Sequence, residues 1–279
     1  MPAPPPEAGA LTVSIVSHGQ ADLIDSLIRQ LARRTAPGLI GRLVLTLNLP
    51  EPVPDDWAGL GSYPLEIIRN RVPAGFAANH NRALADCTRG MVAVLNPDLH
   101  LEGPPLPDRA PAPGRDALSL LCGAAAEPGV GLAVPQVLEA DGTLSDSARD
   151  LLTPASVLSR TLRDRRQASP SPAWYAGMCM VLPVSSWRRV GGFDERYRMY
   201  CEDFDLCARL RLAGLSLVQV PEARIVHAAR RASRRSLRPL GWHLRSLLRV
   251  WRSDAYRDYR HLLQAEAGHG ARPSIRSVG

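Results

Sequence analysis

Short apolar runs alternate with segments of helical spacing through the first hundred residues of the chain. Residues 11–16 form a mostly apolar run that ends at a polar turn, as a buried strand does. Residues 22–34 then carry apolar side chains at helical spacing, and Pro37-Gly38 ends that segment. The same patterns predict further strands at 42–49, 65–69 and 91–96 and a helix at 75–87.

This order of strands and helices predicts an α/β protein with a mostly parallel sheet and helices on both faces. In such sheets ligands bind beyond the carboxyl ends of the strands. Polar residues stand at several of these predicted ends: Ser17-His18, Asn48, and Asn96-Pro97-Asp98. The sequence therefore places a candidate site at this edge of the sheet.

The second half of the chain continues the pattern with one proline-rich interruption at 103–115. Strands are predicted at 130–138, 174–183 and 215–220, the last leading towards His227. Ser185 and Ser186 are expected to cap a helical turn, and a helix is expected to begin near Glu202 and to end at Gly214. The polar, arginine-rich stretch 152–172 fits a mobile lid or a connector.

Charge and composition narrow the class of protein. The 279 residues carry a formal net charge of +7, and all 34 cationic residues are arginine. Such a surface favours anionic partners, including nucleotide phosphates, nucleic acid and acidic membranes. The five cysteines have no metal-site spacing and fit reduced thiols. No apolar stretch is long enough for a membrane span, and the first ten residues do not resemble a secretory signal.

Three acidic or histidine positions could carry chemistry, and each also has a structural interpretation. Asp98 could hold a divalent cation at a strand end, or Asn96-Pro97-Asp98 could be an ordinary turn. Glu202-Asp203 could be catalytic, or could simply complement a helix dipole. His227 could bind a metal or a phosphate, or could be a buried hydrogen-bonding residue.

Taken in order, these motifs resemble family 2 glycosyltransferases of the GT-A fold, most closely the bacterial rhamnosyltransferase-like branch. The branch carries GF-x-A-N-x-N, found here as Gly75 to Asn81, and ED-x-D-L-x-x-R-L, found here as Glu202 to Leu210. The resemblance covers residues 11–232. It implies a glycosyltransferase domain over that range, with a nucleotide-binding half at about 11–100 and an acceptor or catalytic half at about 128–232. Residues 1–10 are expected to be a disordered leader and 233–279 a basic helical tail.

The resemblance implies an inverting enzyme that moves a sugar, with rhamnose a candidate, from a nucleoside diphosphate to an acceptor. Asp203, with Glu202 beside it, occupies the position of the general base. Asp98 and His227 occupy the metal-binding positions, which implies Mg²⁺ or Mn²⁺ as a cofactor. The family's DXD motif is NPD here, so Asn96 lacks one charge. An inactive protein of the same fold therefore remains an alternative.

The same resemblance assigns a nucleotide site and a sugar site. Asn48 stands where many relatives carry an aspartate that contacts the base, and its amide can pair with uracil or thymine. Trp174 and Gly177 lie on the strand expected to face the sugar or acceptor, although a core tryptophan is an equal alternative. Helix-cap or turn roles compete with ligand binding for most of the remaining nucleotide-site residues: Ser17, His18, Asn79, Asn81 and Asn96.

Partners and location follow from the resemblance and from the tail. The implied donor is a dTDP- or UDP-linked sugar, and the implied acceptor is a saccharide or lipid-linked saccharide in cell-surface polysaccharide synthesis. The arginine-rich tail carries leucines at helical spacing, which fits peripheral attachment to the inner face of the cytoplasmic membrane, packing on the domain, or a homodimer. A cytoplasmic location is expected. An arginine-rich nucleic-acid binder is a competing class, but few aromatic residues are present to stack on bases.

Overall fold

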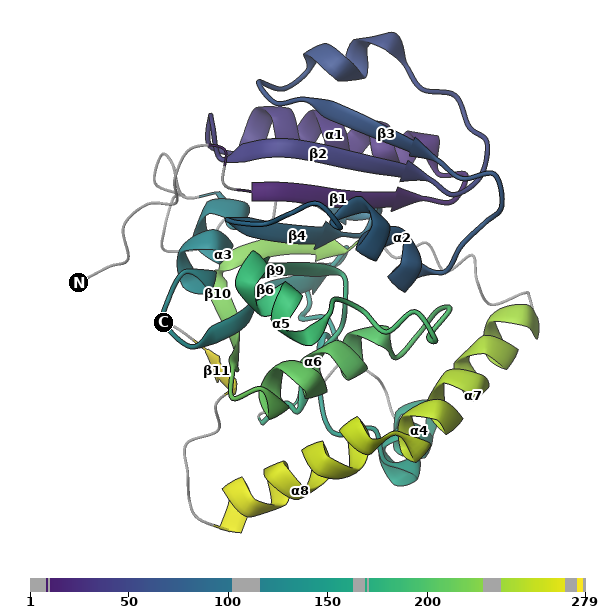
Figure 1. The fold of residues 1–279 in the computed structure, drawn as a ribbon, viewed down its shortest axis with the longest axis vertical. Coiled ribbons are helices and arrows are strands. Elements are labelled where there is room, and N and C mark those ends of the chain that lie inside the picture. Colours follow the sequence, from purple (N-terminus) through teal and green to yellow (C-terminus); the bar gives the residue numbers. More distant parts are fainter. Residues whose placement is uncertain are drawn as a thin grey trace.

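The apolar runs form strands of one nine-stranded sheet in the computed structural model (Figure 1). The structure describes residues 9, 11–101, 116–162, 169, 171–227, 237–268 and 275–277. The sheet strands are β1 (Leu11–Ser17), β2 (Ile40–Leu47), β3 (Leu65–Arg69), β4 (Met91–Leu95), β5 (Leu99–His100), β6 (Val130–Glu139), β9 (Cys179–Pro183), β10 (Ser216–His227) and β11 (Ile275–Ser277). A separate pair is formed by β7 (Ala148–Arg149) and β8 (Trp174–Tyr175).

Helices cover both faces of the sheet. In the view of Figure 1, α2 and α5 lie in front of the strands and α1 lies behind them. The α/β class with a mostly parallel sheet is thus confirmed, with β9 and β5 as its antiparallel members. The helices are α1 (Ala21–Arg34), η1 (Asp55–Gly59), α2 (Phe76–Ala83), α3 (Ala117–Ala125), α4 (Pro154–Leu162), α5 (Val184–Val190), α6 (Glu202–Leu212), α7 (Leu237–Arg252) and α8 (Asp254–Gly268).

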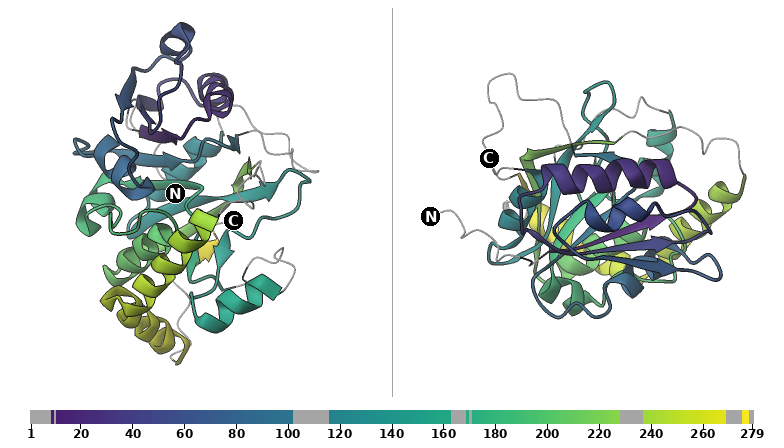
Figure 2. Two further views of the ribbon diagram at one scale, coloured as in Figure 1. Left: turned by 90° about the vertical axis from the view of Figure 1, so that its right-hand side faces the viewer. Right: turned by 90° about the horizontal axis from the view of Figure 1, so that it is seen from above.

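The sheet order β11-β10-β6-β9-β4-β1-β2-β3 decides where the polar strand ends meet. Strands β3, β2, β1 and β4 are parallel, with Ser17 opposite Leu47 and Ile15 opposite Leu95, so their carboxyl ends share one edge. Strand β9 runs antiparallel to β4 and begins at this edge, because Cys179 is opposite Leu95. The left view of Figure 2 looks onto this edge.

Two short segments depart from the expected elements. The expected strand 174–183 is interrupted: β8 and β9 are separated by residues 176–178, which turn at the sheet edge. Helix α5 has the expected position, but its first turn follows Pro183 without a side-chain cap, so the capping role expected for Ser185 and Ser186 is wrong. Part of the stretch 152–172 is helix α4, and the leader 1–10 and the proline-rich loop lie almost wholly outside the described residues.

The tail contains two helices that fold back onto the sheet domain. Ser246, Leu247 and Val250 of α7 are buried, and α8 packs along α6 through Tyr256 and Tyr259. The indole nitrogen of Trp251 donates to the carbonyl of Leu152 at 2.7 Å. Of the three alternatives for the tail, packing on the domain is therefore observed for these helices. No helix in the described ranges has the length and apolar character of a membrane span.

Candidate active site

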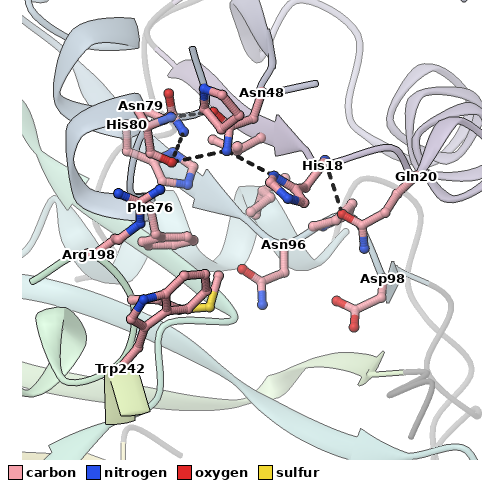
Figure 3. A pocket seen from close by; sticks show the side chains of 16 residues that line it. His18, Gln20, Asn48, Phe76, Asn79, His80, Asn96, Asp98, Arg198 and Trp242 are labelled. Atoms are coloured by element: carbon pink, nitrogen blue, oxygen red, sulfur yellow. Dashed lines mark hydrogen bonds between the residues drawn. The ribbon is translucent and has the colours of Figure 1, made fainter. Parts of the chain in front are cut away.

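A cavity of about 240 Å³ opens at the carboxyl edge of the sheet (Figure 3). Its lining comes from the ends of β1, β2 and β4, the start of α2, the segment before α6, and α7. Three of these segments were expected at a ligand site from the strand-end argument, whereas the last two were not. The lining residues are Val16, His18, Gln20, Asn48, Pro73, Ala74, Phe76, Asn79, His80, Leu95, Asn96, Pro97, Asp98, Arg198, Met199 and Trp242.

Asn48 is held by hydrogen bonds that use its whole amide. Its Oδ1 accepts from the Ala74 backbone N–H at 2.8 Å and from Asn70 Nδ2 at 2.9 Å. Its Nδ2 donates to the Ala74 carbonyl at 3.0 Å and to His18 Nδ1 at 3.0 Å. An amide has two donor hydrogens and two acceptor sites, so all four are occupied. Asn48 therefore fixes the loop at Ala74, and a contact to a nucleotide base would have to replace one of these bonds.

The same network determines how His18 faces the cavity. The two backbone groups of Ala74 fix the orientation of the Asn48 amide, because an N–H must donate and a carbonyl must accept. The Nδ2 group of Asn48 is thus a donor, and Nδ1 of a neutral His18 is the acceptor. The proton of that imidazole then lies on Nε2, which leaves a donor for a ligand on this exposed side chain.

Asp98 and His227 meet although they are far apart in sequence. The two-residue strand β5 pairs with the end of β10, and Leu99 lies opposite His227. Asp98 Oδ2 is consequently 3.0 Å from His227 Nε2. Burial raises the pKa of Asp98, but the hydrogen bond and charge of His227 outweigh it, and the net pKa is lowered. The Asp98 carboxylate therefore remains ionised near neutral pH.

The residues around Asp98 fit a divalent cation bound together with a substrate. Asp98 Oδ1 is buried and has no hydrogen-bond partner among the described residues, so an acceptor oxygen is available there. A carboxylate and an imidazole are suitable ligands for Mn²⁺, and the carboxylate for Mg²⁺. Within the described ranges, no group of three or more His, Cys, Asp or Glu side chains is arranged so that it could hold a metal ion by itself. The donor set is thus incomplete without oxygen atoms from a ligand such as a diphosphate.

Glu202 and Asp203 open helix α6 in different surroundings. Glu202 is 7% exposed, and its Oε2 is buried without a partner among the described residues. Burial raises the pKa of Glu202 well above its usual range, and the negative charge of Asp203 raises it further. Asp203 is less buried, and its two oxygens accept from the backbone N–H groups of Gly177 and Phe204, both at 2.9 Å. Of the two expected catalytic residues, Asp203 has the geometry of an oriented base.

A short chain of hydrogen bonds ties Asp203 to the edge that carries Asp98. The backbone N–H of Asn96 donates to the Met178 carbonyl at 2.9 Å, and the preceding residue, Gly177, donates its backbone N–H to Asp203 Oδ2. Figure 1 likewise shows the start of α6 on the side to which β1 and β4 point. A Cβ atom at Gly177 would lie 3.1 Å from the Cβ of Asp203, so glycine permits this close approach.

The family-like motifs also contain residues that hold the two halves of the sheet domain together. Asn81 lies outside the cavity lining, and its amide binds the backbone N–H and carbonyl of Phe193. A Cβ atom at Gly75 would lie 2.6 Å from the carbonyl oxygen of Arg198. Asn81 and Gly75 thus bring the segment before α6 against the start of α2. Asn79 lines the cavity and accepts from Asn70 Nδ2 at 2.7 Å.

Ser17 and Trp174 have internal partners. Ser17 is fully buried, and its hydroxyl accepts from the Gln20 backbone N–H in the turn that precedes α1. Trp174 is 3% exposed, packs edge-to-face on Phe204, and donates to the Asp150 carbonyl at 2.8 Å. Neither residue is among the lining residues of this cavity. The structure therefore agrees with the turn alternative for Ser17 and with the core alternative for Trp174.

Arg198 and Trp242 are lining residues that the sequence analysis missed. Trp242 does not fall at the helical spacing of the leucines that predicted an amphipathic tail helix. A tryptophan outside that apolar stripe was the feature of the sequence that could have indicated a second contact face. The buried residues Ser246 and Val250 continue its side of α7, while Leu244 and Leu248 are exposed. The leucine pattern therefore identified a side of α7 that is partly exposed to solvent. It did not predict the side of α7 that contacts the cavity.

Residues 113–260 match the family described as "Glycosyl transferase family group 2". Because the match covers more than half of the chain, the protein belongs to this family. The sequence-based resemblance to family 2 glycosyltransferases is therefore confirmed.

Among curated proteins, the chain is 46% identical over 77 residues to rhamnosyltransferase WbbL of Escherichia coli (strain K12), covering 27% of this chain and 29% of that protein. It is 34% identical over 152 residues to the N-acetylglucosaminyl-diphospho-decaprenol L-rhamnosyltransferase of Mycobacterium tuberculosis (strain CDC 1551 / Oshkosh), covering 49% of this chain and 46% of that protein. The matched stretches thus span less than half the length of either relative.

A solved structure supports the expected architecture. The crystal structure of GalNAc-T7 with UDP, GalNAc and Mn²⁺ superposes with a TM-score of 0.61 over 91% of this chain and 50% of that one, at 18% sequence identity. At this identity the likeness concerns the fold alone. The protein has the GT-A fold, as the resemblance implied.

Proposed function

We propose that this protein is an inverting glycosyltransferase that transfers a hexose from a nucleoside-diphosphate donor to a saccharide or lipid-linked saccharide. The observation that carries the proposal is the hydrogen-bonded connection between the NPD turn and Asp203 at one sheet edge. That connection supports a reaction at this edge of the sheet, with Asp203 suited to proton removal and Asp98 suited to a diphosphate-bound cation. The family and the fold agree with this chemistry.

The reaction requires one proton acceptor and stabilisation of one leaving group. Asp203 would accept the proton of the acceptor hydroxyl while its oxygen forms a bond to the anomeric carbon. The bond from that carbon to the donor phosphate breaks, and its electron pair leaves with the diphosphate. Attack opposite the leaving group inverts the anomeric configuration. Glu202, held neutral by burial, would support the position of Asp203 without competing for this proton.

Asp98 and His227 would hold a divalent cation on the donor diphosphate. When bound, the cation would offset the negative charge that builds on the leaving group. Asn96 and the Nε2–H of His18 offer further polar contacts in the cavity. Residues 11–100 would supply most of the nucleotide site and residues 128–232 the acceptor side.

The names of two relatives suggest the finer substrates. Both are rhamnosyltransferases, and the second acts on a diphospho-decaprenol-linked sugar according to its name. We therefore take a dTDP- or UDP-linked sugar, with rhamnose as the first candidate, as the donor. A lipid-linked saccharide in cell-surface polysaccharide synthesis is the matching acceptor. The five free, buried cysteines agree with a cytoplasmic location at the inner face of the membrane.

A thermal-shift panel of UDP, dTDP and GDP, each with and without Mn²⁺ or Mg²⁺, tests the proposal. We expect one nucleotide at saturating concentration to raise the melting temperature by about 5–10 °C only when the cation is present. Asp98→Ala should abolish the cation-dependent part of this rise. Asp258→Ala, which removes an exposed carboxylate of α8, is the matched control. A wild-type protein that responds to no nucleotide under any condition would contradict the proposal.

A further inference from the structure

One wall of the cavity is built by a segment and a helix to which the proposed chemistry assigns no role. Arg198 and Met199 come from the segment before α6, and Trp242 comes from α7. Figure 3 shows Arg198, Phe76 and Trp242 on one side of the cavity and Asn96 and Asp98 on the other. Arg198 is the one arginine among the described lining residues.

Backbone hydrogen bonds to α2 and α7 fix the position of the segment that carries Arg198. Its carbonyl accepts from the Phe76 N–H at 3.0 Å, and Gly75 allows this close approach. On the other side, Ser246 of α7 donates its hydroxyl to the carbonyl of the next residue, Met199, at 3.0 Å. The segment is therefore held between α2 and α7.

The backbone that follows is held in a conformation that side chains rarely adopt. Tyr200 and Cys201 have φ values of 72° and 68°, the two positive values found outside glycine in the described residues. Such conformations persist where the surrounding structure enforces them, and they cluster at functional sites. Here the ring of Tyr200 packs against His243 of α7, with centroids 5.1 Å apart. The strained turn connects Arg198 directly to the start of α6.

The side chain of Arg198 is oriented but has no anionic partner. Its guanidinium carbon lies 5.4 Å from the centroid of the Trp242 ring, within the range of a cation–π contact. No carboxylate within the described part of the chain forms an ion pair with it. By contrast, the nearby Arg196 pairs with Asp194 at 2.6 Å. Arg198 is thus an exposed cation, oriented by Trp242, at the wall of a cavity.

From this geometry we propose that Arg198 binds a substrate diphosphate in this cavity, with Trp242 as its positioning residue. The planar guanidinium donates two parallel hydrogen bonds to phosphate oxygens, and stacking on an indole leaves its edge free to do so. The inference rests on the proposed function for the source of the ligand. A diphosphate occurs in the nucleotide-sugar donor, and another joins the saccharide to the lipid in the acceptor class.

Calorimetry with four probes tests the proposal: inorganic pyrophosphate, a nucleoside diphosphate (UDP or dTDP), the corresponding free nucleoside, and farnesyl diphosphate as a short prenyl diphosphate. We expect Arg198→Gln to weaken pyrophosphate binding by about tenfold to a hundredfold and to leave nucleoside binding unchanged. Arg198→Lys should restore part of the loss. Trp242→Leu should reproduce a weaker form of it, and Trp242→Phe, which keeps an aromatic face, should remain near wild type.

Arg196→Gln is the matched control, because it removes a neighbouring arginine that already has a carboxylate partner. A loss confined to the nucleoside diphosphate assigns the residue to the donor, and a loss confined to farnesyl diphosphate assigns it to the acceptor. Unchanged binding of all three diphosphate-bearing probes by Arg198→Gln would overturn the proposal. Arg198-dependent pyrophosphate binding without any affinity for a nucleoside diphosphate would instead support the anion site and contradict the proposed donor.

Discussion

On the β2–α2 side of the cavity, polar side chains bind one another, whereas on the opposite side they face the cavity. Asn48, Asn70 and Asn79 share hydrogen bonds among themselves and with Ala74, and we call this group the paired wall. Asn96 and Asp98 form the open wall. The side-chain amide of Asn96 makes no hydrogen bond within the described residues, and Asp98 Oδ1 has no partner there.

This difference distinguishes polar residues that stabilise a loop from polar residues that are available to bind a ligand. A buried amide whose hydrogen bonds are complete stabilises a loop, and breaking it leaves several groups unpaired. A polar group without a partner at a cavity is instead available to a ligand. Both walls contain asparagine, so residue type alone does not distinguish them. The comparison predicts that changes in the paired wall affect folding and changes in the open wall affect binding.

Asp203 is the most demanding test of this comparison, because its carboxylate is anchored and yet is proposed to react. Asp203→Asn keeps the shape and removes the proton acceptor. It keeps one of the two backbone contacts, because an amide has a single acceptor oxygen. We expect turnover to fall by about 100- to 10,000-fold, with donor affinity near that of the wild type. Single-turnover kinetics and calorimetry measure the two quantities separately.

The control is Asp205→Asn, two residues further along the same helix. Asp205 is buried in an ion pair with Arg209 at 2.7 Å, so its replacement should lower the melting temperature while turnover per folded molecule persists. Full turnover in Asp203→Asn would remove this residue as the base. Absent turnover already in the wild type would favour the alternative of an inactive protein with this fold.

The second test replaces one asparagine from each wall by leucine. Asn48→Leu should reduce the free energy of unfolding by about 2–4 kcal/mol, because the Ala74 backbone groups and Asn70 lose their partners. Asn96→Leu should change it by less than about 0.5 kcal/mol and should weaken nucleotide binding instead. Urea unfolding and calorimetry on both variants provide the measurements. Equal destabilisation by the two substitutions would remove the distinction between the walls.

The third and smallest effect concerns His80, a fully buried residue of α2 beside the paired wall. Its Nδ1 is 2.8 Å from Ser14 Oγ, and complete burial lowers its pKa to about 3. The unfolded chain binds a proton there below pH 6.5, but the folded protein does so only near pH 3. The free energy of unfolding should therefore decrease as the pH falls from 6.5, by at most about 1.4 kcal/mol per pH unit.

His80→Gln should remove this part of the pH dependence, whatever its effect on stability at pH 7. Urea unfolding of both proteins between pH 7 and pH 4 measures the difference in slope. If the free energy of unfolding depends on pH in the same way in both proteins, burial does not lower the pKa of His80 as proposed.

Much of the fold follows from local patterns. Strand β3 has the predicted bounds, and β1, β2 and β4 differ from prediction by one or two residues at their ends. The strand-end rule placed Asn48, Asn96 and Asp98 at one edge, because parallel strands align their carboxyl ends. These successes depend on apolar runs and turn residues, which the sequence displays directly.

The parts that could not be predicted depend on contacts between distant segments. The two-residue strand β5 brings His227 to Asp98, and so short a strand has no periodic pattern. The saturation of the Asn48 amide depends on how residues 70–74 return to it. Burial of Trp174 requires Phe204 of α6, and Trp242 reaches the cavity only because α7 folds back. The family resemblance did pair His227 with Asp98. It did not predict the hydrogen bonds of Asn48, the burial of Trp174 or the position of Trp242 at the cavity.

The packing of α7 against the sheet domain matters for the design of truncated and chimeric proteins of this family. A boundary drawn after β10, where the family-like motifs end, would cut away Trp242 and the hydroxyl of Ser246 that holds the strained turn. The resulting fragment would keep every motif and would still lack a wall of its own ligand cavity. In chimeras that exchange acceptor specificity, α7 therefore belongs with the sheet it covers and not with whatever follows it.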